Sequence, residues 1–436
     1  MKQGKELLLG VGLLCASIAN AQQIDLTLQQ AIDIALAENP TIKVADRDVA
    51  LKQIADTEAW QALLPEASAT ATIQHTLLAA EMNLGGNKFK MGQDNTNTGA
   101  LAGTLSVPLF APAVYQNMKL TKEDIKLSQE KARASRLDLV NQVTKAYYQM
   151  LLAQDSYKVM QESYKMSKEN YDVVKAKYDV GSVSEYDKIS AEVQMRSMNS
   201  SLVSTQTGLT LAELQLKVLM GVNPEIKVNI NDQLENYENG LVLADVSASE
   251  AELENNSTMR QFEMNRTMLE RALKIQRTNF MPTIALVLTG QYQSLYNHNW
   301  SVWDYSWSPS ASFTISVNVP LFRASNWTKL KTSKLQLEQL EDNKVNTQRQ
   351  LGMAVESYKQ NMASSIAQVE SNKEAVRQAD KAVTIAAKRY EVGRGTILEL
   401  NQSEVALTSA QLTYNQSIYD YLVNKAELDY TLGRGY

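Results

Sequence analysis

The sequence predicts a mixed, mainly α fold in which long helical hairpins and short β-hairpins occur in two similar halves. Two glycine-centred turns, 178–184 and 390–396, share the pattern Tyr-x-Val-Gly and lie 212 residues apart. Residues 113–223 and 321–436 contain no proline, so each region can form long helices. Between these regions, short segments alternate apolar and polar residues with the period of a β-strand. Each glycine turn is therefore predicted to be the tip of a helical hairpin.

Other matching positions indicate that the halves arose by internal duplication. The tetrapeptide Val-Pro-Leu-Phe at 107–110 returns at 319–322, again 212 residues on. Upstream the spacing becomes 217, since Asn39 matches Asn256. One duplication with a five-residue change in loop length explains both spacings. The expected segments are a signal peptide over 1–21, a first repeat over 22–230, and a second repeat over 231–436 that begins with a polar connector.

Residues 1–21 have the pattern of a secretory signal. Lys2 and Lys5 give a positive start, an apolar run follows over 7–16, and Ala19-Asn20-Ala21 is a small-x-small cleavage site. Cys15 is the only cysteine and falls in this leader, so the mature chain is expected to have no disulfide. An uncleaved anchor and a lipoprotein attached through Cys15 are the less favoured alternatives. The net charge of −5 argues against a general affinity for nucleic acid.

The strands are expected as two hairpins, over about 66–108 and 283–320. In the first, alternation over 67–74 and 101–107 flanks a polar loop, and Pro108 is expected to end the second strand. The polar faces carry Ser, Thr, Asn and Gln with almost no charge. A small soluble sheet packed on helices would explain this pattern, and so would a lipid-facing barrel wall. Because about eight strands is the practical minimum for a barrel, several copies would have to contribute.

The longest predicted helix, about Thr121–Tyr178, would be on the order of 85 Å long. Apolar residues recur every seven positions in it and in its counterpart, which predicts coiled-coil packing. Tyrosines at this spacing are more typical of a packing seam than of a cofactor site. The repeated positions are Val143, Met150, Tyr157, Tyr164, Tyr171 and Tyr178, then Val355, Met362, Val369, Val376, Val383 and Tyr390.

No catalytic motif is found. His75 and His298 have no ligand-spaced carboxylates nearby, so we expect no metal, no cofactor and no enzyme activity. The site candidates are acids near the tips, where Asp187 and Glu399 are equivalent at the spacing of 212. Symmetric copies of such acids around an axis would form rings that select cations. Alternatively, they are ordinary acids at helix N-termini, where the helix dipole favours them.

Taken together, the Leu26-to-Pro40 opening, the two Val-Pro-Leu-Phe segments and the paired Tyr-x-Val-Gly tips resemble the TolC-like outer-membrane efflux proteins. The resemblance implies a homotrimer with a 12-stranded transmembrane β-barrel in the outer membrane of a Gram-negative bacterium. Its helical hairpins would form a periplasmic tunnel. It would conduct substrates passively and would join an inner-membrane efflux pump through a periplasmic adaptor.

The same resemblance assigns roles to individual residues. An entrance constriction would involve Glu399, Asp187 and Tyr390, with Gln402 where the family has a second acid, so the closing network must differ in detail. The residues that would dock the adaptor are Val180, Gly181, Ser182, Val392, Gly393 and Arg394. Two other classes remain open: a periplasmic adaptor, which needs a lipoyl-like region not found here, and a soluble coiled-coil scaffold, which would not need the alternating strands.

Overall fold

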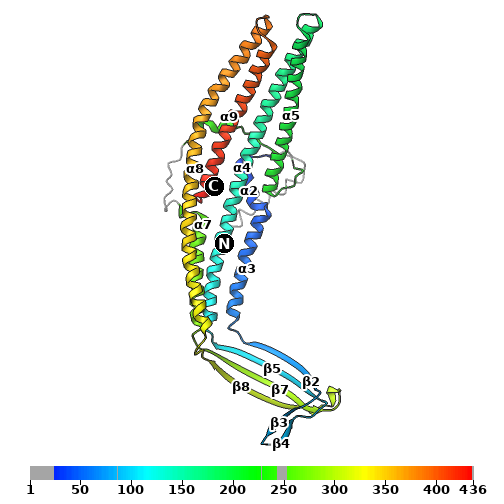
Figure 1. Cartoon of the computed structure of the whole chain (residues 1–436), viewed down its shortest axis with the longest axis vertical. Coiled ribbons are helices and arrows are strands. Elements are labelled where there is room, and N and C mark those ends of the chain that lie inside the picture. The colour runs from blue at the N-terminus through cyan, green and yellow to red at the C-terminus, as the bar shows by residue number, and fades with distance from the viewer. Residues whose placement is uncertain (1–23, 86, 227, 243–252, 435–436) are drawn as a thin grey trace, which may run out of the picture. The chain divides into compact units, whose positions relative to one another are not determined.

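The structure is a computed structural model that describes residues 24–85, 87–226, 228–242 and 253–434. The expected signal peptide, with Cys15, lies outside the described residues. Helices dominate the fold (Figure 1). They are α2 (Leu28–Glu38), α3 (Pro40–Gln61), α4 (Pro112–Asp179), α5 (Glu185–Met220), α7 (Ser257–Thr278), α8 (Ala324–Glu391) and α9 (Ile397–Thr431), with the 3₁₀ helices η1 (Leu234–Gly240) and η2 (Val302–Asp304).

The strands of the described residues form three separate sheets. An antiparallel sheet has the order β2-β5-β7-β8, a hairpin pairs β3 with β4, and two short strands, β1 and β6, pair in parallel. Their bounds are β1 (Ile24–Asp25), β2 (Glu66–Thr76), β3 (Ala80–Leu84), β4 (Asn87–Met91), β5 (Thr96–Phe110), β6 (Val228–Asn229), β7 (Thr283–Asn297) and β8 (Ser308–Asn318).

The two longest helices, α4 and α8, have 68 residues each. At ~1.5 Å per residue, each is about 100 Å long. The helix predicted from Thr121 begins earlier, at Pro112. Proline is tolerated in the first turn because its missing N–H would have no partner inside the helix. Beyond that position no proline interrupts α4, so it continues to the glycine turn.

Contacts divide the chain into two compact units. One consists of Met1–Arg47, Gln129–Gln261 and Asn343–Tyr436, and the other of Asp48–Ser128 and Phe262–Asp342. The first unit contains both helical-hairpin tips and the main apolar core. The second contains the four-stranded sheet.

The core of the first unit is formed by the predicted seven-residue repeats. Val143 and Val355 are fully buried, and Met150 and Met362 are nearly so. Tyr421, at the equivalent register on α9, is 1% exposed and donates its hydroxyl to the backbone oxygen of Val242 at 2.7 Å. The prediction that these residues form a packing seam is confirmed.

Two buried asparagines make matching contacts near the ends of the hairpins. Asn39 caps the start of α3 through the Thr41 backbone N–H, and its amide donates to the Leu219 oxygen at 2.7 Å. Asn256 caps the start of α7, and its amide donates to the Thr431 oxygen at 2.7 Å. Each asparagine thus ties the start of one helix to the end of a hairpin helix.

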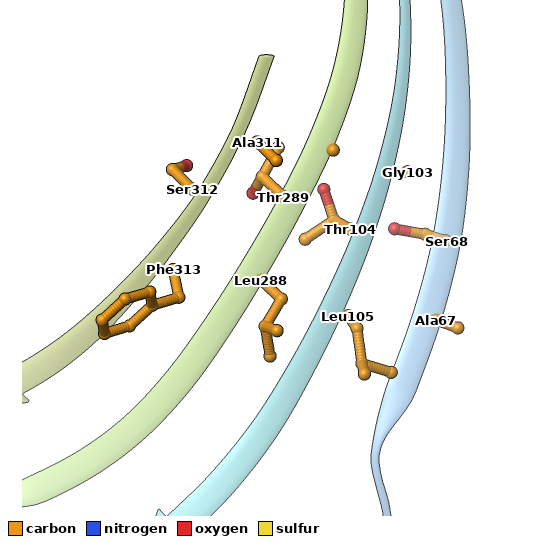
Figure 2. A pocket seen from close by; sticks show the side chains of 11 residues that line it. Ala67, Ser68, Gly103, Thr104, Leu105, Leu288, Thr289, Ala311, Ser312 and Phe313 are labelled. Carbon is orange, nitrogen blue, oxygen red and sulfur yellow. The ribbon is translucent and has the colours of Figure 1, made fainter. Parts of the chain in front are cut away.

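The four-stranded sheet has one apolar and one polar face, as the alternation predicts. In one row across the strands, Leu105, Leu288 and Phe313 are partners in the pairing register, and Figure 2 shows them crossing β5, β7 and β8. One residue along, on the opposite face, the aligned residues are Ser68, Thr104, Thr289 and Ser312. A row of small residues leaves a shallow hollow beside the apolar row: Ala69, Gly103, Gly290 and Ala311.

Two details of the strand prediction are wrong. Pro108 does not end its strand, since β5 continues to Phe110. By then β5 is paired only with β7, because its pairing with β2 stops at Ser106, and the register shifts between Pro108 and Phe110. A missing N–H is tolerated at such an edge or bulge. The expected polar loop also contains the hairpin β3–β4.

Candidate functional site

The two glycine tips have the same backbone geometry. Gly181 has φ of 72°, and Gly393 has φ of 73°. In the first tip the Gly181 and Ser182 N–H groups bond to the oxygens of Tyr178 and Lys177, both at 2.8 Å. In the second tip, the N–H groups at the equivalent positions bond to the equivalent backbone oxygens. A left-handed glycine with these paired bonds is the Schellman motif, so the prediction of a glycine-terminated helix is confirmed.

Each tip is followed by a side-chain cap on the next helix. Ser184 accepts a bond from the Asp187 backbone N–H at 3.2 Å, and the Asp187 carboxylate accepts one from the Ser184 N–H at 3.2 Å. Thr396 accepts from the Glu399 N–H at 3.2 Å. The Glu399 carboxylate instead lies 3.4 Å from Arg389. The Asp187 side chain therefore helps to cap its own helix, whereas the Glu399 side chain does not help to cap α9.

All six residues predicted to dock an adaptor lie exposed at the tips. The exposed fractions of Val180 and Val392 are 79% and 67%. Gly181, Ser182, Gly393 and Arg394 are exposed as well. A Cβ atom added to either tip glycine would meet nothing within 4 Å. The glycines are thus required by backbone conformation, and the surface around them is open.

The residues predicted to form a constriction are only partly brought together. Tyr390 is half-buried, and burial raises the pKa of its hydroxyl, with the Asp187 charge adding to the effect. Among the described residues that hydroxyl has no hydrogen-bond partner. Glu399 and Gln402 are exposed on α9, one turn apart. Tyr390 is therefore influenced by the charge of Asp187, and Glu399 pairs with Arg389.

Helices of both hairpins pack together beneath the tips. Val174 of α4, Ala191 of α5, Ala386 of α8 and Ile397 of α9 form one buried cluster with Leu400. Lys177 of the first hairpin lies with its ammonium nitrogen 5.0 Å from the centre of the Tyr390 ring in the second. Such cation–π contacts contribute about 0.5–1 kcal/mol at exposed sites. This contact was not predicted, because nothing in the sequence pairs the two hairpins.

Sequence reasoning also missed a buried acid. Glu404 on α9 is 4% exposed, one to two turns beyond Glu399. Its carboxylate accepts bonds from Ser167 at 3.4 Å and from the Asn170 amide, both on α4. Burial raises the pKa of Glu404 to about 7, and the two hydrogen bonds partly oppose the rise. The sequence held a signal for this site, since Ser167 is the polar residue in a second seven-residue series that is otherwise apolar: Ala146, Ala153, Met160, Ser167 and Val174.

In the described residues, no group of three or more His, Cys, Asp or Glu side chains could hold a metal ion. His75 stacks on Trp300 with ring centres 5.1 Å apart and bonds to Asn97 at 2.8 Å. No helix in the described part of the chain is both long and apolar enough to span a membrane.

Several known proteins are similar to this chain over nearly its whole length. The protein TolC of Salmonella enteritidis is 22% identical over 442 residues, covering 99% of this chain and 87% of that protein. TolC of Escherichia coli K12 is 21% identical over 435 residues, covering 97% and 85%.

Solved structures show the same fold. The outer membrane protein VceC from Vibrio cholerae superposes with a TM-score of 0.73 at 15% identity, covering 93% of this chain and 96% of that one. The open state of the MtrE outer membrane channel from Neisseria gonorrhoeae gives a TM-score of 0.73 at 18% identity, covering 93% and 88%.

The sequence profile described as "Outer membrane efflux protein" matches residues 31–222 and 248–434, which together make up most of the chain. The match confirms the resemblance to TolC-like proteins and the predicted location in the outer membrane of a Gram-negative bacterium. The chain belongs to the outer membrane efflux protein family.

Proposed function

We propose that this chain forms, as a homotrimer, the outer-membrane channel of a tripartite efflux or secretion system. Each protomer would contribute four strands to a 12-stranded barrel, and the helical hairpins would form a tunnel in the periplasm. Substrates would pass passively from an inner-membrane pump and a periplasmic adaptor to the exterior. In this role the protein is a conduit and needs neither cofactor nor catalytic group.

The observation that carries the proposal is the four-stranded sheet with its two different faces. On β8, the exposed fractions of Phe313, Ile315 and Val317 are 74%, 59% and 58%. A soluble protein rarely exposes so much contiguous apolar surface, whereas a membrane-facing strand requires it. The intervening residues of β8 are Thr or Ser, which suit a water-filled lumen.

The edges of the same sheet support an assembly of several copies. In the sheet order, β2 and β8 each have a neighbouring strand on one side only. Such edges would be left unsatisfied in lipid unless other strands paired with them. Since four strands cannot close a barrel, copies of the chain must supply the rest. Two copies would give eight strands, and the three copies that the family resemblance implies give 12.

An internal duplication is supported by the paired contacts of the two halves. Asn39 and Asn256 cap equivalent helices and bind equivalent carbonyls, and the two tips share one hydrogen-bond pattern. The duplication would give each protomer two similar hairpins. Both exposed tips would then be available to the adaptor, with Val180 and Val392 as apolar contacts.

The constriction is proposed at the tip end of α9. Glu399 is exposed there and is not used to cap its own helix. Three copies of Glu399, with Asp187 and Tyr390 nearby and Gln402 one turn on, would line a narrow entrance. The alternative of a periplasmic coiled-coil adaptor or scaffold is not favoured, because the family match spans both halves and neither role uses the two-faced sheet.

The test is to purify the mature protein in detergent, measure its mass, and record its conductance in planar bilayers. The proposal expects a trimer mass and discrete, cation-selective channels. A heat-unfolded sample is the control for detergent artefacts. A soluble monomer that needs no detergent and gives no conductance would refute the proposal and favour the scaffold.

A further inference from the structure

A polar cluster is buried where α9 packs on α4, two to three turns along α9 from the second tip. Ser163 and Thr408 have hydroxyl oxygens 2.7 Å apart, and both are buried. One turn nearer the tip, Ser167 and Asn170 donate to the buried Glu404 carboxylate. The cluster interrupts an apolar seam, and all its cross-helix bonds join the first hairpin to the second. Its hydrogen bonds therefore stabilise the contact between the two hairpins rather than either hairpin alone.

The equivalent position in the first half shows what is unusual about Glu404. Glu192 lies 212 residues earlier, on α5, and pairs with Arg196 at 2.7 Å. The residue equivalent to Arg196 in the second half is Thr408. Thr408 donates its hydroxyl to the Glu404 backbone oxygen at 2.9 Å and supplies no positive charge. Where the first half has an ion pair, the second half thus has a buried carboxyl group held by neutral partners.

Glu404 has no counter-ion among the described residues, and no charged neighbour contributes to the shift of its pKa. The ionisable side chains within one turn of its partners on α4 are exposed or half-buried: Tyr164, Lys165, Lys168, Glu169, Tyr171 and Asp172. On α5, Glu192 and Arg196 pair with each other at 2.7 Å. The helix α5 also contacts α9 near this site, since the Ser190 hydroxyl lies 3.5 Å from the Asn401 amide nitrogen. Gln194 lies one turn further along α5. The Gln194 amide nitrogen is buried without a partner among the described residues.

We propose that Glu404 is a proton-binding site that makes the α4–α9 contact a latch: protonated Glu404 holds the second tip closed, and loss of the proton releases it. This inference rests on the proposed channel function and concerns its regulation. The partners suit both states, because a serine hydroxyl can donate to a carboxylate or accept from a carboxylic acid. A buried carboxylate without a cation is costly, so the ionised form favours an arrangement in which water reaches it.

The direction of the pH effect follows from linkage. In the packed α4–α9 contact, which we take as the closed state, burial raises the pKa of Glu404 to about 7, above the ordinary value of a glutamate that water reaches. This difference in pKa stabilises the closed contact. The stabilisation is complete when the pH is below the ordinary pKa, and it is lost as the pH rises through the raised pKa. The ratio of open to closed channels should therefore increase with pH by up to about tenfold per unit per protomer in this window, and level off above it.

The test is single-channel recording of the wild-type protein and Glu404→Gln between pH 5 and pH 8.5. Wild type should open more as pH rises, whereas the variant should lose this dependence and stay closed more often, since glutamine keeps the hydrogen bonds and cannot ionise. Glu192→Gln is the matched control and should keep the wild-type response. A Glu404→Gln channel that titrates like wild type, or a conducting wild type with no pH response, would overturn the inference.

Two further measurements separate the latch from the channel itself. In infrared spectra near pH 6, a protonated carboxylic acid band should be present in wild type and missing from Glu404→Gln; its presence in both would refute the proton site whether or not the protein conducts. Joining α4 to α9 with a disulfide in Ser163→Cys/Thr408→Cys should abolish the pH-dependent opening, and reduction should restore it. Failure of every variant to conduct would instead count against the proposed function.

Discussion

The ammonium group of Lys177 sits over the ring of Tyr390, 5.0 Å from its centre, and so joins the tips of two hairpins that are far apart in the sequence. Tyr178, the equivalent of Tyr390 in the first half, has Lys188 over its ring at 4.7 Å, but that lysine belongs to the same hairpin. The two tyrosines are equivalent in sequence and differ in what they connect.

Removing the Tyr390 hydroxyl should not weaken the fold. Because this oxygen is buried without a partner among the described residues, Tyr390→Phe should leave the free energy of unfolding unchanged or raise it by about 1 kcal/mol. Thermal unfolding followed by circular dichroism measures this, with Tyr178→Phe as the control. A clear loss of stability in Tyr390→Phe would show that the hydroxyl is bonded in the assembled protein.

Alanine at either tip glycine should destabilise the hairpin through backbone strain alone. In Gly181→Ala and Gly393→Ala the added Cβ meets nothing, but the positive φ disfavours alanine by about 1–2 kcal/mol. Gly208 in the middle of α5 is the matched control, since it also has open space and no positive φ. Gly208→Ala should raise stability by about 0.5–1 kcal/mol. Equal shifts in melting temperature for all three variants would contradict this explanation.

Glu399→Ala should alter ion selectivity with little effect on stability. The Glu399–Arg389 pair is about half exposed on both sides, so its loss should cost under ~1 kcal/mol. If Glu399 belongs to an acidic ring, the reversal potential in a salt gradient should move toward lower cation preference. Asp187→Ala is the informative comparison, because it also removes the carboxylate half of the capping box with Ser184. An unchanged reversal potential in Glu399→Ala would remove it from the ring.

Arginine on the apolar face of the sheet should block membrane assembly. Leu288 pairs with Leu105 and Phe313 on that face, and a charge there costs about 2–4 kcal/mol at the bilayer midplane. The next residue, Thr289, lies on the polar face, so Thr289→Arg should assemble normally. Trimer yield in outer-membrane fractions measures both. Normal yield for Leu288→Arg would mean that this face does not contact lipid.

Much of the fold could be predicted because it depends on local rules. The Schellman turns at Gly181 and Gly393 need only a residue that tolerates positive φ, and the caps at Ser184 and Thr396 need only a side-chain oxygen at the right offset. The buried stripe through Val143 and its equivalents follows from a seven-residue repeat. Each of these features is encoded within a few turns of chain.

Other features depended on partners distant in the sequence. Pro108 stays within β5 because β2 no longer pairs there, and sequence reasoning treated the proline as a stop. The hairpin β3–β4 was predicted as loop because of the glycine and asparagine residues around it, although its two five-residue strands do alternate apolar and polar residues. For the candidate site, the two glycine tips were predicted, but the Lys177–Tyr390 contact between hairpins was not.

The sequence by itself determined the helices, the tips, the two-faced strands and the family, because periodicity and turn chemistry act over short distances. Only the tertiary structure decided which helices meet, and hence that Glu404 is buried against Ser167 and Asn170 while its equivalent Glu192 stays paired with Arg196. A glutamate's environment is set by the residues that surround it in space. These lie 234 to 237 positions away for Glu404, and no local pattern specifies them.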